Sequence, residues 1–158
     1  MTTYENIIKL LADKSVYYSE IDHPEVITAV EASKVREGIS LNEGAKSLIL
    51  KIKRDNKKEY VNVVICGNEK FNSKLLKSVL DTNEISFASP EEVMNVTNGV
   101  QPGGVPPFGN LFGIKVYADE NLLKNEKIAF SAGSRTKTIV MNVVDWQTIV
   151  NPIIIKLY

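Results

Sequence analysis

Apolar residues recur every three or four positions in several stretches of the chain, which is the spacing of one helix face. Two of these stretches open with a Thr-x-x-Glu capping box, at Thr2 and at Thr28, where side chains can satisfy free backbone amides. Gly38 is placed to end the second stretch from the C′ position. The pattern predicts helices from Thr2 to about Asp13, from Thr28 towards Gly38, over Phe71–Val79, from Ser89 to near Asn98, and a short last one from Asp145.

Other short stretches alternate apolar with polar residues, which is typical of half-buried strands. The charged segment Lys53–Glu59 separates two of them and predicts an exposed hairpin turn. Helices and strands mix freely, with no internal repeat and no low-complexity linker. The order favours one α+β domain over residues 1–158, with a curled, barrel-like sheet, mixed or mostly antiparallel, flanked by helices. The expected strands are Val16–Ile21, Lys46–Ile52, Tyr60–Cys66, Ile85–Ala88, Gly113–Tyr117, Ile128–Ser131 and Thr138–Val143.

The charge balance limits the partners that the chain can recognise. Basic and acidic residues both total 19, so no net field attracts nucleic acid or an anionic membrane. A nucleic-acid partner would therefore be recognised over a small part of its length, because a footprint of many phosphates requires a basic excess. No apolar run approaches the roughly 20 residues that cross a bilayer, and the first residues lack a signal-peptide pattern. We expect a cytoplasmic protein with no membrane partner.

The inventory of reactive side chains excludes several kinds of chemistry. The chain has one histidine, His23, and one cysteine, Cys66, whereas a zinc site usually needs three or four such ligands. A Ser-His or Cys-His nucleophile pair would have to use His23 itself. His23 precedes Pro24 in a turn and is interpreted as a hydrogen-bonding brace, while Cys66 ends an alternating strand and is interpreted as a small core residue. We expect no metal and no cofactor.

The segment Gly99–Gly109 has the most unusual composition in the chain. Four glycines and three prolines fall within its eleven residues. Glycine permits positive φ angles and close approach of a ligand, and proline removes conformational freedom before binding. The composition predicts a stiff loop whose amides form a cradle for an oxyanion or a phosphate. A tight connection between helix and strand would need only two or three such residues, and no Gly-Lys-Ser/Thr follows to make a nucleotide P-loop.

Two further segments are candidates for a site. Lys46 directly precedes a buried apolar strand, so its ammonium could reach over a pocket rim to a phosphate, a hydroxyl or an oxyanion. On spacing alone, an exposed lysine at a strand end is the commoner outcome. Ser131–Ser134 follows another strand, and its small residues predict either a shallow pocket with exposed backbone donors or a plain hairpin turn.

In their order along the chain, these segments resemble the YbaK/prolyl-tRNA-synthetase-associated family of aminoacyl-tRNA deacylases. The resemblance covers roughly Tyr17 to Asp145 and implies an editing domain that hydrolyses the ester of a wrongly charged tRNA. It also implies catalysis without metal or protein nucleophile, in which a water or a group of the substrate attacks. The segments that carry it are Asp22-His23-Pro24, Gly44–Leu48, Ala88–Val93, Gly103–Gly109 and Ser131–Gly133.

The resemblance also implies roles for particular residues. Lys46 is implied to contact the terminal nucleotide or the aminoacyl carbonyl. Gly103 and Gly104, in a Gly-x-x-x-Pro segment that ends at Pro107, are implied to shape the amino-acid pocket and to offer amides to the ester. A side chain added at either glycine is then expected to fill that pocket. The substrate-binding residues expected beside them are Tyr18, His23, Gly99, Val105, Pro106, Pro107, Phe108, Gly109, Ser131, Ala132, Gly133 and Ser134.

The identity of the substrate is a finer expectation. The cysteine-clearing branch of the family reads Ser-Gly-Gly-Lys-Arg where this chain has Ser-Ala-Gly-Ser-Arg over 131–135, which disfavours a cysteinyl group. Alanine on the proline tRNA is the first expectation, with seryl-, threonyl- and cysteinyl-tRNA as alternatives. The expected partners are the 3′ aminoacyl-adenosine end of a mischarged tRNA and prolyl-tRNA synthetase or another synthetase.

Two different readings compete with a deacylase. The first is a non-catalytic module that binds the tRNA 3′ end or a synthetase complex, as part of a larger synthetase. Loss of Lys46 or of the loop glycines would favour it, and both are present. The second is a hydrolase acting on a small ester. A Gly-x-Ser-x-Gly elbow would favour this reading, and the chain does not contain one.

Overall fold

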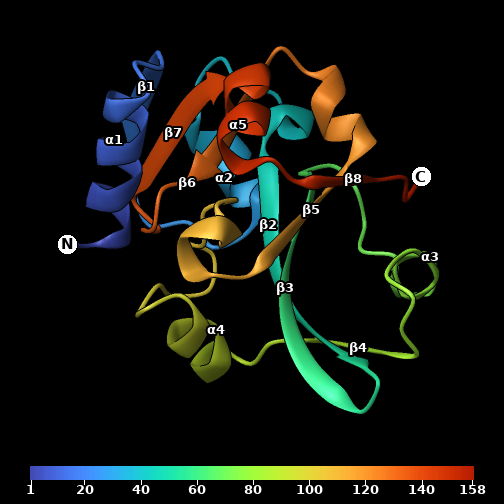
Figure 1. The fold of residues 1–158 in the computed structure, drawn as a ribbon. Coiled ribbons are helices and arrows are strands. Elements are labelled where there is room, and N and C mark those ends of the chain that lie inside the picture. Colours follow the sequence, from blue (N-terminus) through green and yellow to red (C-terminus); the bar gives the residue numbers. More distant parts are fainter.

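The computed structural model describes residues 1–158 as two β-sheets with helices packed around them (Figure 1). The larger sheet has five strands in the order β4-β2-β3-β5-β8. Its central hairpin is antiparallel, and β5 and β8 are added in parallel on one side. The strands are β2 (Ala45–Arg54), β3 (Lys57–Cys66), β4 (Glu84–Phe87), β5 (Lys115–Asp119) and β8 (Ile153–Ile155).

The smaller sheet has three antiparallel strands in the order β1-β7-β6. Its strands are β1 (Tyr18–Asp22), β6 (Lys127–Ser131) and β7 (Lys137–Asn142).

The prediction of an α+β domain is confirmed, but the prediction of a single curled, barrel-like sheet is wrong. The two sheets are joined in backbone pairing only by an isolated bridge between Gly44 and Ala129. On that edge, β2 pairs with β4 over Leu50–Lys53, so its first residues border a pocket instead of continuing a ladder with β6. The ladder between the two sheets therefore never closes.

Five α-helices and three short 3-10 turns surround the sheets. The capping boxes at Thr28 and Ser89 form with both of their hydrogen bonds, whereas at Thr2 only the bond from the Glu5 amide is present. The second helix ends at Val35, three residues before Gly38, whose φ of +77° lies beyond the cap. The helices are α1 (Thr3–Asp13), α2 (Ala29–Val35), α3 (Ser73–Val79), α4 (Pro90–Val96) and α5 (Val143–Val150), and the turns are η1 (Leu41–Glu43), η2 (Gly109–Phe112) and η3 (Glu120–Lys124).

The main core lies between the two sheets, α1 and α5. Trp146, Phe108 and Phe130 are its largest fully buried side chains, and the two phenylalanine rings lie 5.3 Å apart. Cys66 belongs to this cluster, which confirms its interpretation as a small core residue. A second cluster packs α3 on the other face of the larger sheet, where Figure 1 shows α3 standing to one side of the β2–β3 hairpin.

The hairpin turn is shorter than the sequence predicted. The charged segment Lys53–Glu59 was expected to form the whole turn, but only Asp55 and Asn56 lie outside the strands. Both adopt left-handed backbone angles, with φ of 49° and 61°, which Asp and Asn tolerate better than most residues. None of the helices has the length and apolarity that crossing a bilayer requires, and α1, with 11 residues, is the longest.

Candidate active site

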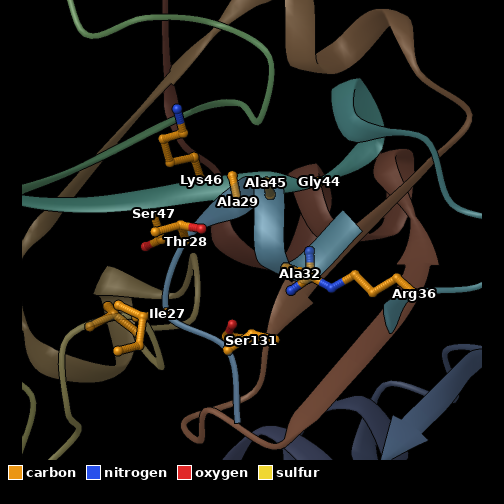
Figure 2. Close-up of a pocket in the computed structure, with 13 residues that line it drawn as sticks. Ile27, Thr28, Ala29, Ala32, Arg36, Gly44, Ala45, Lys46, Ser47 and Ser131 are labelled. Atoms are coloured by element: carbon orange, nitrogen blue, oxygen red, sulfur yellow. The ribbon is translucent and has the colours of Figure 1, made fainter. Parts of the chain in front are cut away.

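A pocket of about 70 Å³ opens beside the first residues of β2 (Figure 2). We call it the β2 pocket. The segment leading into α2 forms one side of it, and the loop Gly99–Gly109 and the end of β6 form the other. Its lining residues are Val26–Ala29, Ala32, Arg36, Gly44–Ser47, Gly103, Val105 and Ser131.

The β2 pocket brings together four of the residues that the sequence singled out. Lys46 comes from β2, Gly103 and Val105 from the glycine-rich loop, and Ser131 from the end of β6. These residues are up to 85 positions apart in the chain, and three different elements deliver them. Their roles toward a substrate stay predictions, but they share one cavity.

Lys46 lies at the edge of the β2 pocket. Its Nζ donates a hydrogen bond of 2.9 Å to the carbonyl oxygen of Glu69. Successive side chains of a strand point to opposite faces, and in Figure 2 Lys46 points away from Ser47 and Ile27. Burial lowers the pKa of Lys46, and the carboxylate of Glu69 partly opposes that shift. That bond uses one of the three ammonium protons, and the other two have no partner in the protein.

Gly103 forms one wall of the β2 pocket by close contact with the segment before α2. Its φ is +88°, and a Cβ there would lie 2.9 Å from the Cα of Ile27 and 3.0 Å from its carbonyl oxygen. Only glycine satisfies both the backbone angle and the contact. The amides of Gly103 and Val105 form no hydrogen bond with another group of the protein, and both residues line the cavity.

Gly104 has a different role from its neighbour. Its amide donates to Gln101, its carbonyl accepts from the Gly133 amide, and both distances are 2.9 Å. A Cβ on Gly104 would meet the backbone of Ser134 at 3.2 Å. Gly104, Gly133 and Ser134 therefore join the loop to the β6–β7 turn, and a side chain at Gly104 would press on that turn rather than fill the β2 pocket.

Side chains from β2, β3, α5 and the β6–β7 turn hold the glycine-rich loop by its backbone. Sequence reasoning missed these anchors, because the partners are far apart in the chain. The loop is consequently fixed before any ligand binds, as its composition predicted. The bonds are Ser47 Oγ to Pro106 O at 3.1 Å, Trp146 Nε1 to Pro107 O at 2.9 Å, Gly109 N to Asn62 Oδ1 at 3.2 Å and Arg135 Nε to Pro102 O at 2.7 Å.

The other predicted substrate-binding residues lie outside the lining of the β2 pocket. Phe108 and Ala132 are fully buried in the core, and Tyr18 pairs with Met141 in the smaller sheet. Gly99 ends the turn after α4 with a φ of +102°. Pro106, Pro107 and Gly109 act on the loop through their backbone groups.

His23 shares a hydrogen-bond partner, Thr138, with the pocket-lining Arg36. Its Nδ1 lies 2.9 Å from the Pro24 carbonyl and its Nε2 lies 2.8 Å from Thr138 Oγ1. A carbonyl only accepts, so Nδ1 carries the proton in the neutral ring and Nε2 accepts from Thr138. The residue therefore has the bracing geometry expected of it. The one hydroxyl that faces it, Thr138 Oγ1, is fully buried and also accepts from Arg36.

Arg36 is a lining residue that the sequence did not reveal. It is 6% exposed and caps the C-terminus of α2, four positions after the buried Ala32, and both residues line the pocket. Its Nε donates to Thr138 Oγ1 at 2.9 Å, and burial lowers its pKa to about 10. The spacing of four residues from the apolar Ala32 was the only feature of the sequence that could have indicated Arg36 as a lining residue.

The site contains donors but no activated nucleophile. Burial raises the pKa of the Cys66 thiol to about 11, which keeps it protonated near neutral pH. The groups that can act on a ligand are the cations Lys46 and Arg36 and the free amides of Gly103 and Val105. Such an arrangement can orient an ester and stabilise the negative charge that develops on its carbonyl oxygen.

The fold has counterparts among solved structures. One is described as a candidate trans-editing enzyme for prolyl tRNA synthetase, with a TM-score of 0.79, 19% identity and coverage of 99% of this chain and 97% of that one. Another, a hypothetical protein, has a TM-score of 0.82 at 20% identity, covering 95% of this chain and 97% of its own. At such identities the likeness defines the fold class alone.

Sequence comparison is more specific. Residues 23–149 match the family described as the aminoacyl-tRNA editing domain. The chain is 29% identical over 151 residues to the multifunctional Ser/Thr-tRNA deacylase ProXp-y of Escherichia coli strain K12, covering 95% of the chain and 89% of that relative. It is 33% identical over 101 residues to a proline–tRNA ligase of Staphylococcus saprophyticus, of which it spans 17%.

These findings define first a class, hydrolases of aminoacyl esters on tRNA. Because residues 23–149 match its model, the chain belongs to the aminoacyl-tRNA editing domain family. By this homology it is an aminoacyl-tRNA deacylase.

Proposed function

We propose that the chain acts in trans on tRNA that carries a small, wrongly attached amino acid, and hydrolyses the ester in the β2 pocket. The observation that carries the proposal is the meeting of Lys46, Gly103 and Ser131 at one small cavity. The family match covers all three residues.

In the proposed reaction, the aminoacyl group enters the β2 pocket and the terminal adenosine lies at its edge. The Lys46 ammonium, already held by the Glu69 carbonyl, has protons left for the nucleotide or for the aminoacyl carbonyl. The free amides of Gly103 and Val105 stabilise the oxyanion as it forms. A water or the neighbouring ribose hydroxyl attacks, because no protein nucleophile is available at the site.

The volume of about 70 Å³ favours small aminoacyl groups such as alanyl, seryl and threonyl. A synthetase rejects a smaller amino acid only weakly, since one methylene is worth about 1–3 kcal/mol, and a second, smaller site can remove the error. Alanine on the proline tRNA stays a prediction. The relative named as a Ser/Thr-tRNA deacylase supports placing seryl and threonyl groups beside it.

A deacylation panel tests the proposal. Purified protein is mixed in excess with tRNA bearing alanine, serine, threonine, cysteine or the matching amino acid, and the loss of each ester is timed. We expect hydrolysis well above the buffer rate for at least one of the small aminoacyl groups. On the proline tRNA, the correctly attached prolyl group should not be hydrolysed above the buffer rate. Binding of the tRNA end without faster hydrolysis of any ester would contradict the proposal and favour a non-catalytic binding module.

A further inference from the structure

Arg36 is a buried cation without a counter-ion. It is 6% exposed and lines the β2 pocket, yet none of the five ion pairs of the protein includes it. Buried charged groups are normally paired, because removing a charge from water is costly. The guanidinium is therefore not held by a carboxylate of the protein, and its donors are available to a hydrogen-bond acceptor in the pocket.

Most of the hydrogen-bonding capacity of Arg36 is unused. A guanidinium has five N–H donors. Nε bonds to Thr138 Oγ1 at 2.9 Å, and Nη1 makes a long contact of 3.5 Å with the Ala129 carbonyl. The other donors have no partner in the protein. In Figure 2 the guanidinium lies beside Ala32.

Two features hold the guanidinium in this position. Thr138 is fully buried, and its hydroxyl donates to His23 Nε2, which leaves its oxygen free to accept from Arg36. On the opposite side, a Cβ on Gly44 would lie 3.4 Å from Nη1, so the glycine leaves room for the group. Fixed donors of this kind recognise a ligand with little loss of entropy on binding.

We infer that Arg36 recognises the side-chain hydroxyl of a seryl or threonyl group, and so makes the site prefer these substrates over alanyl. The inference rests on the proposed function. A cavity of about 70 Å³ admits the tip of a side chain. Ala32 and Val26 offer apolar contact for the remaining carbon atoms. An alanyl group leaves the donors unpaired, and sites built to bond a hydroxyl discriminate strongly against analogues that lack it.

Stable substrate analogues test the inference without catalysis. The probes are 3′-deoxyadenosines in which a 3′-amide carries either serine or alanine, and binding is measured by calorimetry. We expect wild-type protein to bind the seryl compound about 10–100-fold more tightly than the alanyl one. Arg36→Met should remove most of that preference. Arg54→Met, which deletes the same charge at the other end of β2, should keep it.

The outcomes separate the inference from the proposed function. A wild-type protein that binds both compounds equally would overturn the inference, as would an Arg36→Met protein that keeps the preference. Equal weakening of both compounds would show that Arg36 binds the part they share, and would also overturn it. If the preference depends on Arg36 but no aminoacyl-tRNA is hydrolysed, the recognition role stands and the deacylase proposal falls.

A melting curve accompanies each variant. Should Arg36→Met fail to fold, Thr138→Val removes the oxygen that orients Nε, together with the hydrogen bond to His23, and leaves Arg36 in place. It should then reduce the preference for the seryl compound, and an undiminished preference would count against the inference.

Discussion

At the scale of single residues, neighbouring residues of β2 have different roles. Lys46 reaches the Glu69 carbonyl at the pocket edge, whereas Ser47 bonds the Pro106 carbonyl and holds the loop. Strand alternation explains this division, since consecutive side chains leave a strand on opposite faces. The sequence indicated Lys46 through its place before a buried apolar strand together with the family resemblance, since spacing alone favours an exposed strand-end lysine. It could not indicate Ser47, whose partner lies 59 residues further along the chain.

Asn62 gives a test of how the loop is held. This fully buried side chain accepts from the Gly109 amide and donates to Ser47 Oγ and the Leu48 carbonyl. Asn62→Ala leaves these groups without a partner, so we expect a loss of about 1–3 kcal/mol in the free energy of unfolding. Urea denaturation measures it. The exposed Asn68→Ala serves as control and should change stability by less than about 0.5 kcal/mol, and equal effects would contradict the anchor role.

Gly103 gives a test of the pocket wall. Gly103→Ala adds both the strain of a positive φ and a clash with the backbone of Ile27. Gly113→Ala is a matched control, because its φ is +72° but nothing lies within 4 Å of the added Cβ. We expect both variants to lose stability by about 1–2 kcal/mol from backbone strain. Only Gly103→Ala should slow deacylation at least tenfold in a single-turnover assay, and equal rates in the two variants would exclude the wall from the site.

At the scale of elements, most local signals and the β2–β3 hairpin were predictable, whereas the pairing of distant strands was not. The capping boxes of α2 and α4 lie within four residues each, so they were predictable from the sequence. The strand β8 was missed. Its three residues gain their strand structure only by pairing in parallel with β5, and a run that short carries no period.

Helix α4 is tied to the larger sheet through Glu92, which gives a prediction for acid stability. Hydrogen bonds from Tyr60, the Ser89 amide and Lys51 lower the pKa of Glu92 from 4.5 to about 2. A carboxyl whose pKa is depressed by folding stabilises the folded state above its unfolded value. That stabilisation is lost as the pH falls from 4.5 towards 2.

The matching experiment follows the melting temperature between pH 7 and pH 2. Glu92→Gln should melt lower than wild type at pH 7, and the difference should shrink as the pH falls below about 4.5. Glu91→Gln alters an exposed neighbour in the first turn of the same helix and should show no such convergence. A constant difference across the range would contradict the role of Glu92.

At the scale of the whole molecule, the sequence predicted the fold class and the order of the site segments, but not how they meet. The separation into two sheets depends on β2 leaving β6 after one bridge, and no local pattern encodes that departure. The same departure creates the β2 pocket between Ile27, Lys46 and Ser131. Arg36 could not be recognised as a lining residue before α2 was placed against β6 and β7. Tertiary packing therefore determines how the site segments meet and which residues line the pocket, and local motifs do not.

The most direct test of the central claim is the single-turnover rate of deacylation by Lys46→Ala, on whichever small aminoacyl-tRNA the wild type hydrolyses fastest. Removing an ammonium that contacts the nucleotide or the developing oxyanion should slow the reaction by about 100–1,000-fold while the melting temperature stays near wild type. Lys74→Ala, at an exposed position of α3, should react at the wild-type rate. A folded Lys46→Ala protein that hydrolyses the ester as fast as wild type would contradict the assignment of the β2 pocket as the active site.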